Sequence, residues 1–480
     1  MKNSALLQLG SWGCLRIMVM RVYLSLLACI LLVLLPVPVF SGCTCQPFGA
    51  TQPYFVDTVP HSEGGVIILW SEPREGKLRA QRLDSQGRAM WGNGHPVALF
   101  NKPNHIVGWS MLTNYVDEAV AVWDIRPSGD KHYKLYAQRL DGGGNLYWGT
   151  DGIRVSDATD SQERPILVND DSGGVIVVWE SLRYASDGQI LEKNGLRAQR
   201  INSSGERLWT EFGIPVSTQS IISDSSGGLI GVASDGAKSI FCERIDKDGG
   251  TLWRVWVTNV ADDMEVSYPN LISDNDGGAI IGWLRSTKGT DFRDWAYCLQ
   301  RVDPNGKLLW QEVTIDEMSH EQDRPLMVPD SLEGVILLRD YGKQAIRIDA
   351  AGKIQWSVPI PVAATSYPVH PIQLSAARDS TDILLAWRVA GRIPTEGGEI
   401  HVQKLDSYGR FLWGTEGIPV FSPETFKTQT TPLIISDGSG GAIIVALLGR
   451  GSHGADSIQA QRIDSDGNLL WGEDGIKLKP

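Results

Sequence analysis

Hydrophobic and polar residues follow one order that recurs along the chain. A short, continuous apolar run such as Val66–Trp70 is followed by a polar stretch and then by an alternating segment such as Arg79–Asp84. Alternation with a period of two predicts a half-buried strand, and a short apolar run between turn residues predicts a strand buried on both faces. The apolar run recurs at Ala119–Trp123, Val175–Trp179, Leu229–Val232, Ala279–Trp283, Val335–Leu338, Ile383–Trp387 and Ala442–Ala446.

Each alternating segment leads through a tight turn to a tryptophan. The last copy reads QAQRIDSDGNLLWGEDGI over 459–476, and Asp466-Gly467 predicts a hairpin turn because glycine adopts positive φ without a steric cost. This pattern predicts a fourth strand that ends at the tryptophan. The equivalent residues are Trp91, Trp148, Trp209, Trp253, Trp310, Trp356, Trp413 and Trp471.

Eight such copies predict a β-propeller. A repeat of this length that is built from strands forms a ring or a solenoid. We therefore expect an all-β fold with eight four-stranded blades over residues 53–480, beginning with a strand at Pro53–Val56 and closing without strand exchange. Seven blades are the alternative, if the sixth repeat, which has Arg339 in place of the second-strand tryptophan, is degenerate.

Residues 1–42 have the pattern of an export signal. Val22–Phe40 is almost entirely apolar, with a basic residue before it and small residues after it. Met18 and Met20 are alternative starts that would give a shorter leader. Plain secretion and an uncleaved membrane anchor are both consistent with this segment.

The end of this leader resembles a bacterial lipobox. The matching residues are Phe40-Ser41-Gly42-Cys43, with phenylalanine where leucine is usual. The resemblance implies cleavage before Cys43 and attachment of a lipid to it, with residues 43–52 as the lipidated cysteine and a spacer. Two or three lipid chains would be needed for stable tethering to the membrane.

The charge balance and the cysteines exclude several classes of partner. The chain has 44 basic and 56 acidic residues, so nucleic acid is not an expected partner. No Cys-x-x-Cys pair indicates a zinc or redox site. Cys242 and Cys298 lie on successive third strands and are predicted to be small buried residues or, as the alternative, a disulfide. No cofactor is expected, although turns such as Asp274–Asp276 offer oxygen ligands for calcium.

The recurring text resembles three kinds of repeat. Asp-x-x-Gly-x-x-x-Trp, as in 464–471, resembles the tryptophan-docking repeat of quinoprotein-like propellers, a family that includes outer-membrane lipoproteins with roles in envelope assembly. It also resembles the Asp-box of sialidases, in which the tryptophan is nearer the glycine. Ala-Gln-Arg-Leu-Asp-x-x-Gly is similar to the repeats of bacterial exported surface proteins. This last resemblance covers the most residues and implies a propeller at the cell surface, without an activity.

Arginine and aspartate recur two residues apart on the third strands, as in Arg82/Asp84 and Arg462/Asp464. Side chains two apart on a strand share a face at about 7 Å. Each pair is therefore predicted to form a salt bridge or to bind the backbone of a neighbouring blade. Eight equivalent positions rarely make one active site, so we assign these residues and the repeated tryptophans to the scaffold.

Loop length singles out one face of the predicted ring. The first-to-second and third-to-fourth turns are short, whereas the other connections vary, and alternate connections of a blade share a face. Variable loops on a rigid scaffold are where binding usually resides. Aromatic side chains beside charges favour sugar or peptide recognition there, above all in Phe292–Trp295. The candidate ligand-binding residues are Asp124, Arg126, Tyr133, Glu180, Arg183, Arg293, Asp294 and Trp295.

These features predict a monomeric, non-catalytic lipoprotein propeller at the cell envelope that binds a protein or a glycan. No His-Glu-x-x-His or Gly-x-Ser-x-Gly motif is present. One alternative is a glycan-acting hydrolase or lyase, which needs two carboxylates about 5–10 Å apart. The other alternative is an envelope-assembly scaffold.

Overall fold

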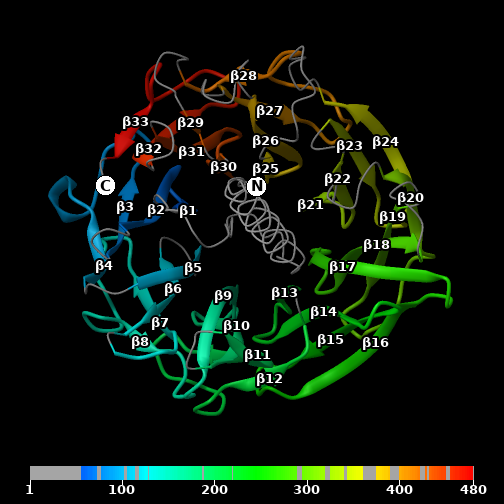
Figure 1. Cartoon of the computed structure of the whole chain (residues 1–480). Helices are drawn as coiled ribbons and strands as arrows, with labels where there is room; N and C mark the ends of the chain where they lie inside the picture. The colour runs from blue at the N-terminus through cyan, green and yellow to red at the C-terminus, as the bar shows by residue number, and fades with distance from the viewer. Residues whose placement is uncertain are drawn as a thin grey trace, which may run out of the picture. The chain divides into compact units, whose positions relative to one another are not determined.

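The protein is an all-β, eight-bladed propeller (Figure 1). Eight antiparallel sheets stand around a central axis, and the seven-bladed alternative is wrong. The computed structural model describes residues 56–72, 77–101, 105–113, 118–127, 129–185, 189–218, 220–288, 295–318, 325–339, 343–360, 374–389, 399–421, 428–429, 432–449 and 455–478. No helix among them is long and apolar enough to cross a membrane.

Each sheet is built from strands that are consecutive in the chain, with the first strand nearest the axis and the last at the outer edge (Figure 1). Blades 1 to 4 comprise β1 (Val56–His61), β2 (Gly65–Glu72), β3 (Lys77–Leu83) and β4 (Val97–Asn101); β5 (His105–Thr113), β6 (Ala119–Arg126), β7 (Lys134–Leu140) and β8 (Ile153–Arg154); β9 (Ser161–Asn169), β10 (Val175–Tyr184), β11 (Ile190–Ile201) and β12 (Ile214–Val216); and β13 (Ser220–Ser223), β14 (Leu229–Asp235), β15 (Ser239–Ile245) and β16 (Thr251–Asn259).

Blades 5 to 8 comprise β17 (Met264–Ser273), β18 (Ala279–Thr287), β19 (Trp295–Val302) and β20 (Val313–Met318); β21 (Leu326–Pro329), β22 (Val335–Arg339), β23 (Gln344–Ile348) and β24 (Ile354–Pro359); β25 (Leu374–Asp379), β26 (Asp382–Val389), β27 (Glu399–Leu405) and β28 (Ile418–Pro419); and β29 (Thr428–Gln429), β30 (Leu433–Ser436), β31 (Ala442–Gly449), β32 (Ala455–Ile463) and β33 (Ile476–Leu478). In blade 8, β29 and β30 pair with successive parts of β31 and so share the innermost position.

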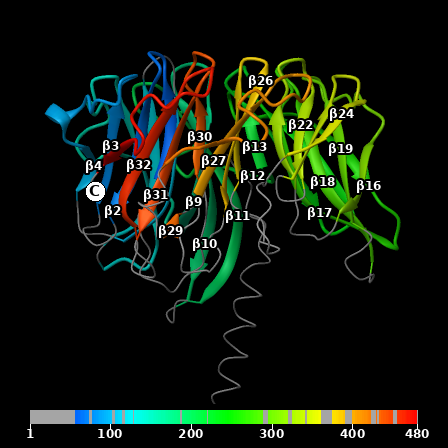
Figure 2. The same ribbon diagram turned by 90° about the horizontal axis from the view of Figure 1, so that it is seen from above.

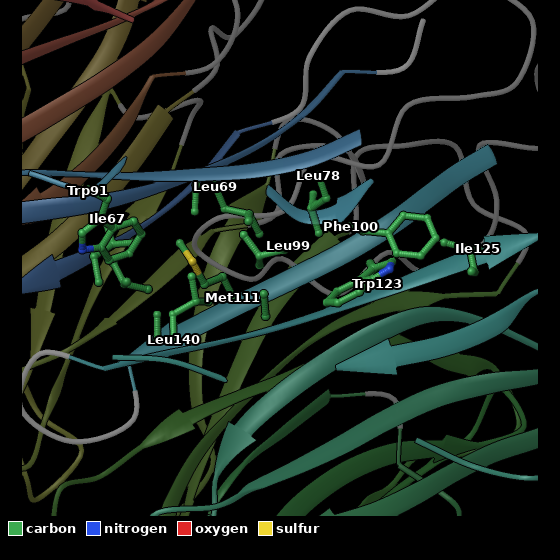
Figure 3. Close-up of a cluster of buried hydrophobic side chains, with 14 residues drawn as sticks. Ile67, Leu69, Leu78, Trp91, Leu99, Phe100, Met111, Trp123, Ile125 and Leu140 are labelled. Atoms are coloured by element: carbon green, nitrogen blue, oxygen red, sulfur yellow. The ribbon is translucent and has the colours of Figure 1, made fainter. Parts of the chain in front are cut away.

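The second strands are buried on both faces, as their apolar runs predict. Val66–Trp70 in β2 is fully buried. Its alternate residues face opposite neighbours, so Ile67 and Leu69 pack toward blade 2 whereas Val66 and Ile68 pack toward blade 8. Figure 3 shows the first of these clusters, with Met111 and Trp123 of blade 2 against Leu69 and Leu99 of blade 1. The core therefore lies between the blades. Burial of each such side chain contributes about 1.5–3 kcal/mol.

The fourth strands differ from the prediction. In blade 1 the return from the hairpin forms only a bridge between Leu83 and Ala89, and the paired strand β4 begins after Trp91. In four blades a glycine with positive φ follows the tryptophan and ends the strand there. These glycines are Gly92, Gly149, Gly414 and Gly472. In blades 3 and 5, Thr210 and Gln311 follow the tryptophan and no strand runs through it either. In blades 4 and 6, where Arg254 and Ser357 follow the tryptophan, β16 and β24 run through it.

The first strand of blade 1 was predicted at Pro53–Val56, of which only Val56 lies within the described residues. It begins at Val56, within the described residues, and ends at His61. The turn predicted after it is present at residues 62–64, before β2 begins at Gly65. Blades 1 and 8 each contain only strands from their own repeat, so the expectation of closure without strand exchange is confirmed for the described strands.

The repeated tryptophan and arginine bind the next blade together. In blade 1, Trp91 Nε1 and Arg82 Nη1 both donate to the backbone oxygen of Gly142, in the third-to-fourth turn of blade 2, at 2.9 and 3.0 Å. Blade 3 repeats this geometry, with Trp209 and Arg200 donating to Lys247 at 3.0 and 3.1 Å. The scaffold role predicted for these residues is therefore confirmed.

The predicted salt bridge between residues two apart is wrong. Asp84 accepts the backbone N–H groups of Gln86 and Arg88, both at 2.9 Å, and so closes its own turn. The arginine partner is instead an acidic residue of the first-to-second turn, as in the pair of Arg200 and Asp170 at 3.1 Å. Turn closure needs an acceptor beside the glycine, so the aspartate faces the turn and not the arginine.

The two cysteines of the described propeller are free and buried, so the disulfide alternative is wrong. Both lie in the apolar cluster between blades 4 and 5. Burial raises the pKa of both thiols, that of Cys298 to about 12. They behave as small hydrophobic residues, as the other interpretation predicted.

Candidate functional site

A cluster of polar side chains lies on the long-loop face where blades 2 and 3 meet. Four segments supply it: the end of β6, the start of β7, the start of β9 and the end of β10. Since strands alternate in direction, these four positions share one face, from which the β10–β11 hairpin projects (Figure 2). We call this group the Tyr133 cluster, and its members are Asp124, Arg126, Tyr133, Ser161, Glu163, Arg164, Glu180 and Tyr184.

Tyr133 stands in the middle of the cluster. Its backbone N–H donates to Ser161 Oγ at 2.8 Å, and only 6% of the residue is exposed. The guanidinium of Arg126 lies over its ring, 5.7 Å from the centroid. Burial raises the pKa of the Tyr133 phenol, Arg126 opposes that rise, and the carboxylates of Glu163 and Asp124 add to it. The phenol therefore lies within the field of all three charged groups.

Glu163 places a buried carboxylate beside this phenol. The residue is 5% exposed, and its Oε1 accepts hydrogen bonds from Ser161 Oγ and Tyr184 Oη, both at 2.7 Å. Burial and this hydrogen bond to Glu163 raise the pKa of Tyr184, so its hydroxyl remains a donor. The described residues supply no hydrogen bond to Oε2 of Glu163, which leaves an acceptor for a ligand.

Arg164 is held in a strained backbone conformation. Its φ is 54°, at a bulge where the register between β9 and β10 shifts before Glu180. A non-glycine residue in this region costs about 1–3 kcal/mol and is found where the surroundings impose it. Its backbone N–H donates to Asp124 Oδ2 at 3.3 Å, and its guanidinium binds both oxygens of Glu180 at 3.0 and 2.9 Å. The bulge thereby joins the two carboxylates from neighbouring blades.

Lys134 fixes the connection that leads into the cluster. Its buried ammonium donates to the backbone oxygens of Ala158, Thr159 and Asp160, at 3.2, 2.7 and 3.2 Å. Burial lowers the pKa of Lys134. Gln162 adds a second tie, because its Oε1 accepts the backbone N–H of Leu135 at 3.0 Å. The start of β9 is therefore positioned by β7 of the preceding blade.

The structure thus brings together Asp124, Arg126, Tyr133 and Glu180. Arg183 lies further out on the β10–β11 hairpin, exposed, with Glu192 at 3.9 Å. Trp295 begins β19 in blade 5, half-buried against the apolar cluster between blades 5 and 6. Arg293 and Asp294, with Phe292, lie outside the described residues, as does Cys43.

Sequence reasoning missed Ser161, Glu163, Arg164 and Lys134. A usable signal was present in the polar text Ser161–Arg164, which stands where an inner strand begins. A second signal is the position directly after the second-strand tryptophan, which is charged in Asp124, Glu180 and Arg388.

The aspartates of the short turns have a structural role, because their carboxylates are already hydrogen-bonded within the scaffold. Oδ1 of Asp274 accepts the backbone N–H groups of Asp276 and Gly278, and Oδ2 accepts Arg301 Nε at 2.9 Å. Within the described part of the chain, no group of three or more histidine, cysteine, aspartate or glutamate residues is placed to hold a metal ion. The turn interpretation accounts for the geometry of this residue.

Comparison with known proteins gives similarities of fold only. No family model matches the chain, and no curated protein matches it. Among solved structures, the chain is similar to a lectin from Burkholderia pseudomallei (11% identity, 90% of this chain and 100% of that chain, TM-score 0.43). It is also similar to the β-propeller domain of a trilobed protease from Pyrococcus furiosus (9%, 78% and 99%, 0.43) and to a streptogramin B lyase (16%, 65% and 85%, 0.33).

Proposed function

We propose that this protein is a non-catalytic, lipid-tethered surface propeller that binds a glycan at the Tyr133 cluster. The observation that carries the proposal is the open oxygen of Glu163, held in place by the hydroxyls of Ser161 and Tyr184. A fixed carboxylate beside two tyrosines offers acceptors for sugar hydroxyls and apolar rings for the sugar's faces. The alternative is a protein ligand at the same face, and a pull-down experiment would distinguish it from a glycan.

A glycan array with the purified full-length protein tests this proposal. Glu163→Gln and Tyr184→Phe should each reduce binding at least tenfold, because each changes a hydrogen bond that orients the site. Tyr408→Phe is the matched control, since Tyr408 is exposed in a short turn of blade 7. Binding that survives both cluster variants would place the ligand elsewhere.

The tether is a separate part of the proposal. The leader pattern and the Phe40–Cys43 resemblance support it. β1 enters the ring at Val56 from the long-loop face, and the thirteen steps from Cys43 span at most about 47 Å when extended. A lipid on Cys43 would therefore keep the Tyr133 cluster near the membrane surface. Metabolic labelling with a fatty acid should mark the wild type, and a Cys43→Ser variant that still labels would contradict it.

A glycan-acting enzyme is the second candidate, favoured by one observation. Glu163 and Glu180 are paired directly across β9 and β10, so two carboxylates share the site. Both are already engaged, Glu180 by both contacts to Arg164 and Glu163 by two hydroxyls. Release of reducing ends from a bound oligosaccharide, abolished by Glu163→Gln, would establish the enzyme in place of the binding protein.

A further inference from the structure

The arginines of the site differ in how their charge is satisfied. Arg164 is neutralised by Glu180 through two contacts, and Arg183 has Glu192 nearby. Arg126 is exposed and forms no ion pair or hydrogen bond within the described part of the chain. Its contact is the face of Tyr133, which orients the guanidinium and leaves its N–H groups open.

This guanidinium and the carboxylate of Glu163 lie near the same phenol. The guanidinium lies over the ring of Tyr133, and both charges act on the ionisation of its phenol. The neighbouring negative charges are already bonded, since Asp124 accepts the backbone N–H of Arg164 and Glu180 pairs with its side chain. The site therefore presents a guanidinium and a carboxylate acceptor near the same aromatic ring.

We propose that the ligand of the Tyr133 cluster is an acidic saccharide whose sugar carboxylate binds Arg126. A planar guanidinium binds a carboxylate through two parallel hydrogen bonds, which is stronger and more directional than a contact to a neutral hydroxyl. A ring hydroxyl of the same sugar donates to Oε2 of Glu163. This inference rests on the glycan-binding function proposed above and names the chemical class of the glycan.

The test uses the full-length protein and uronic-acid oligomers, each compared with the same oligomer after esterification of its carboxylates. We expect the acid form to bind at least tenfold more tightly, and raising the salt concentration to reduce that difference because screening weakens the ion pair. Arg126→Ala should abolish the difference, and Arg126→Lys should restore part of it, since lysine keeps the charge but lacks the fork. Arg88→Ala, at an exposed arginine in a short turn of blade 1, should change nothing.

Several results would overturn the inference. One is equal binding of the acid and ester forms. Another is unchanged binding by an Arg126→Ala variant that melts at the same temperature as the wild type. The third is stronger binding of an amino-sugar oligomer than of the uronate. If these occur while Glu163→Gln and Tyr184→Phe still remove glycan binding, the glycan-binding function stands and the acidic class is wrong. If no oligomer binds and neither of those variants matters, the proposed function itself is wrong.

Discussion

The indole N–H of Trp471 donates to the backbone oxygen of Ser85 at 3.1 Å, across 386 residues of sequence. This contact joins blade 8 to blade 1, and it repeats the contact that joins the other blades. Arg462 Nη1 donates to the same oxygen at 2.9 Å. The ring is therefore closed by side chains and not by a shared strand.

Trp471→Phe should destabilise the protein more than its lost area implies. The variant keeps most of the apolar contact but removes one donor to Ser85, a loss of about 1–2 kcal/mol. Chemical unfolding of the variant measures this. Trp256→Phe is the control, because Trp256 is half exposed on the outer strand of blade 4. Equal effects of the two substitutions would show that the closing hydrogen bond contributes nothing measurable.

Arg200→Met should be among the most destabilising substitutions of a charged residue. Asp170 is 1% exposed, and removing its arginine leaves a buried carboxylate without its cation, at a cost of about 3–5 kcal/mol.

Arg82→Met provides the comparison for that variant. Arg82 bonds the next blade in the same way, but its carboxylate partner Glu63 is mostly exposed. The difference in unfolding free energy between Arg200→Met and Arg82→Met should therefore reflect carboxylate burial. A difference near zero would contradict this account.

Local pattern was sufficient to predict the blades but not how they interlock. Runs such as Val66–Trp70 predict their own burial, because a strand packed between two sheets needs apolar residues on both faces. The partner of Arg82 is in the next blade, about sixty residues away, and spacing within one strand carries no information about it. In blade 1, the later start of the fourth strand could have been predicted from Trp91-Gly92, since the positive φ of Gly92 ends the strand.

The candidate site shows the same division. Asp124, Tyr133 and Glu180 were predicted because they interrupt the repeat on the long-loop face. Glu163 and Arg164 were missed because their environment depends on a bulge in β9 and on packing against the preceding blade. Such a site forms only when two repeats meet, so neither repeat alone reveals it.

The stability of the ring should depend on the ionisation of Asp57. This aspartate is buried in β1, where it accepts the backbone N–H groups of Thr58 and Met111 at 2.8 and 3.0 Å. Burial raises its pKa to about 7 from the ordinary value of 3.8. The folded protein therefore binds this proton more tightly than the unfolded chain does. Its stabilising contribution is complete below the unfolded pKa and is lost as pH rises through about 7.

Thermal melting of the wild type and Asp57→Asn between pH 5 and pH 8 checks this dependence. The variant cannot ionise, so the melting temperature of the wild type relative to it should fall across that interval. The turn aspartates, such as Asp84, have lowered pKa values and stay ionised throughout it. Parallel curves for the two proteins would show that Asp57 does not titrate in this range.

Lys134 should govern the order of the candidate site without contacting a ligand. Lys134→Met keeps the length and the apolar stem but removes the ammonium that binds three carbonyl groups. We expect faster hydrogen exchange over residues 155–162 and a loss of about 1–3 kcal/mol in stability. Glycan affinity should fall with it, because Ser161 and Glu163 follow that segment directly. Lys247→Met is the control, since Lys247 is exposed beside Asp248. Unchanged exchange over 155–162 in Lys134→Met would show that the ammonium does not hold this connection.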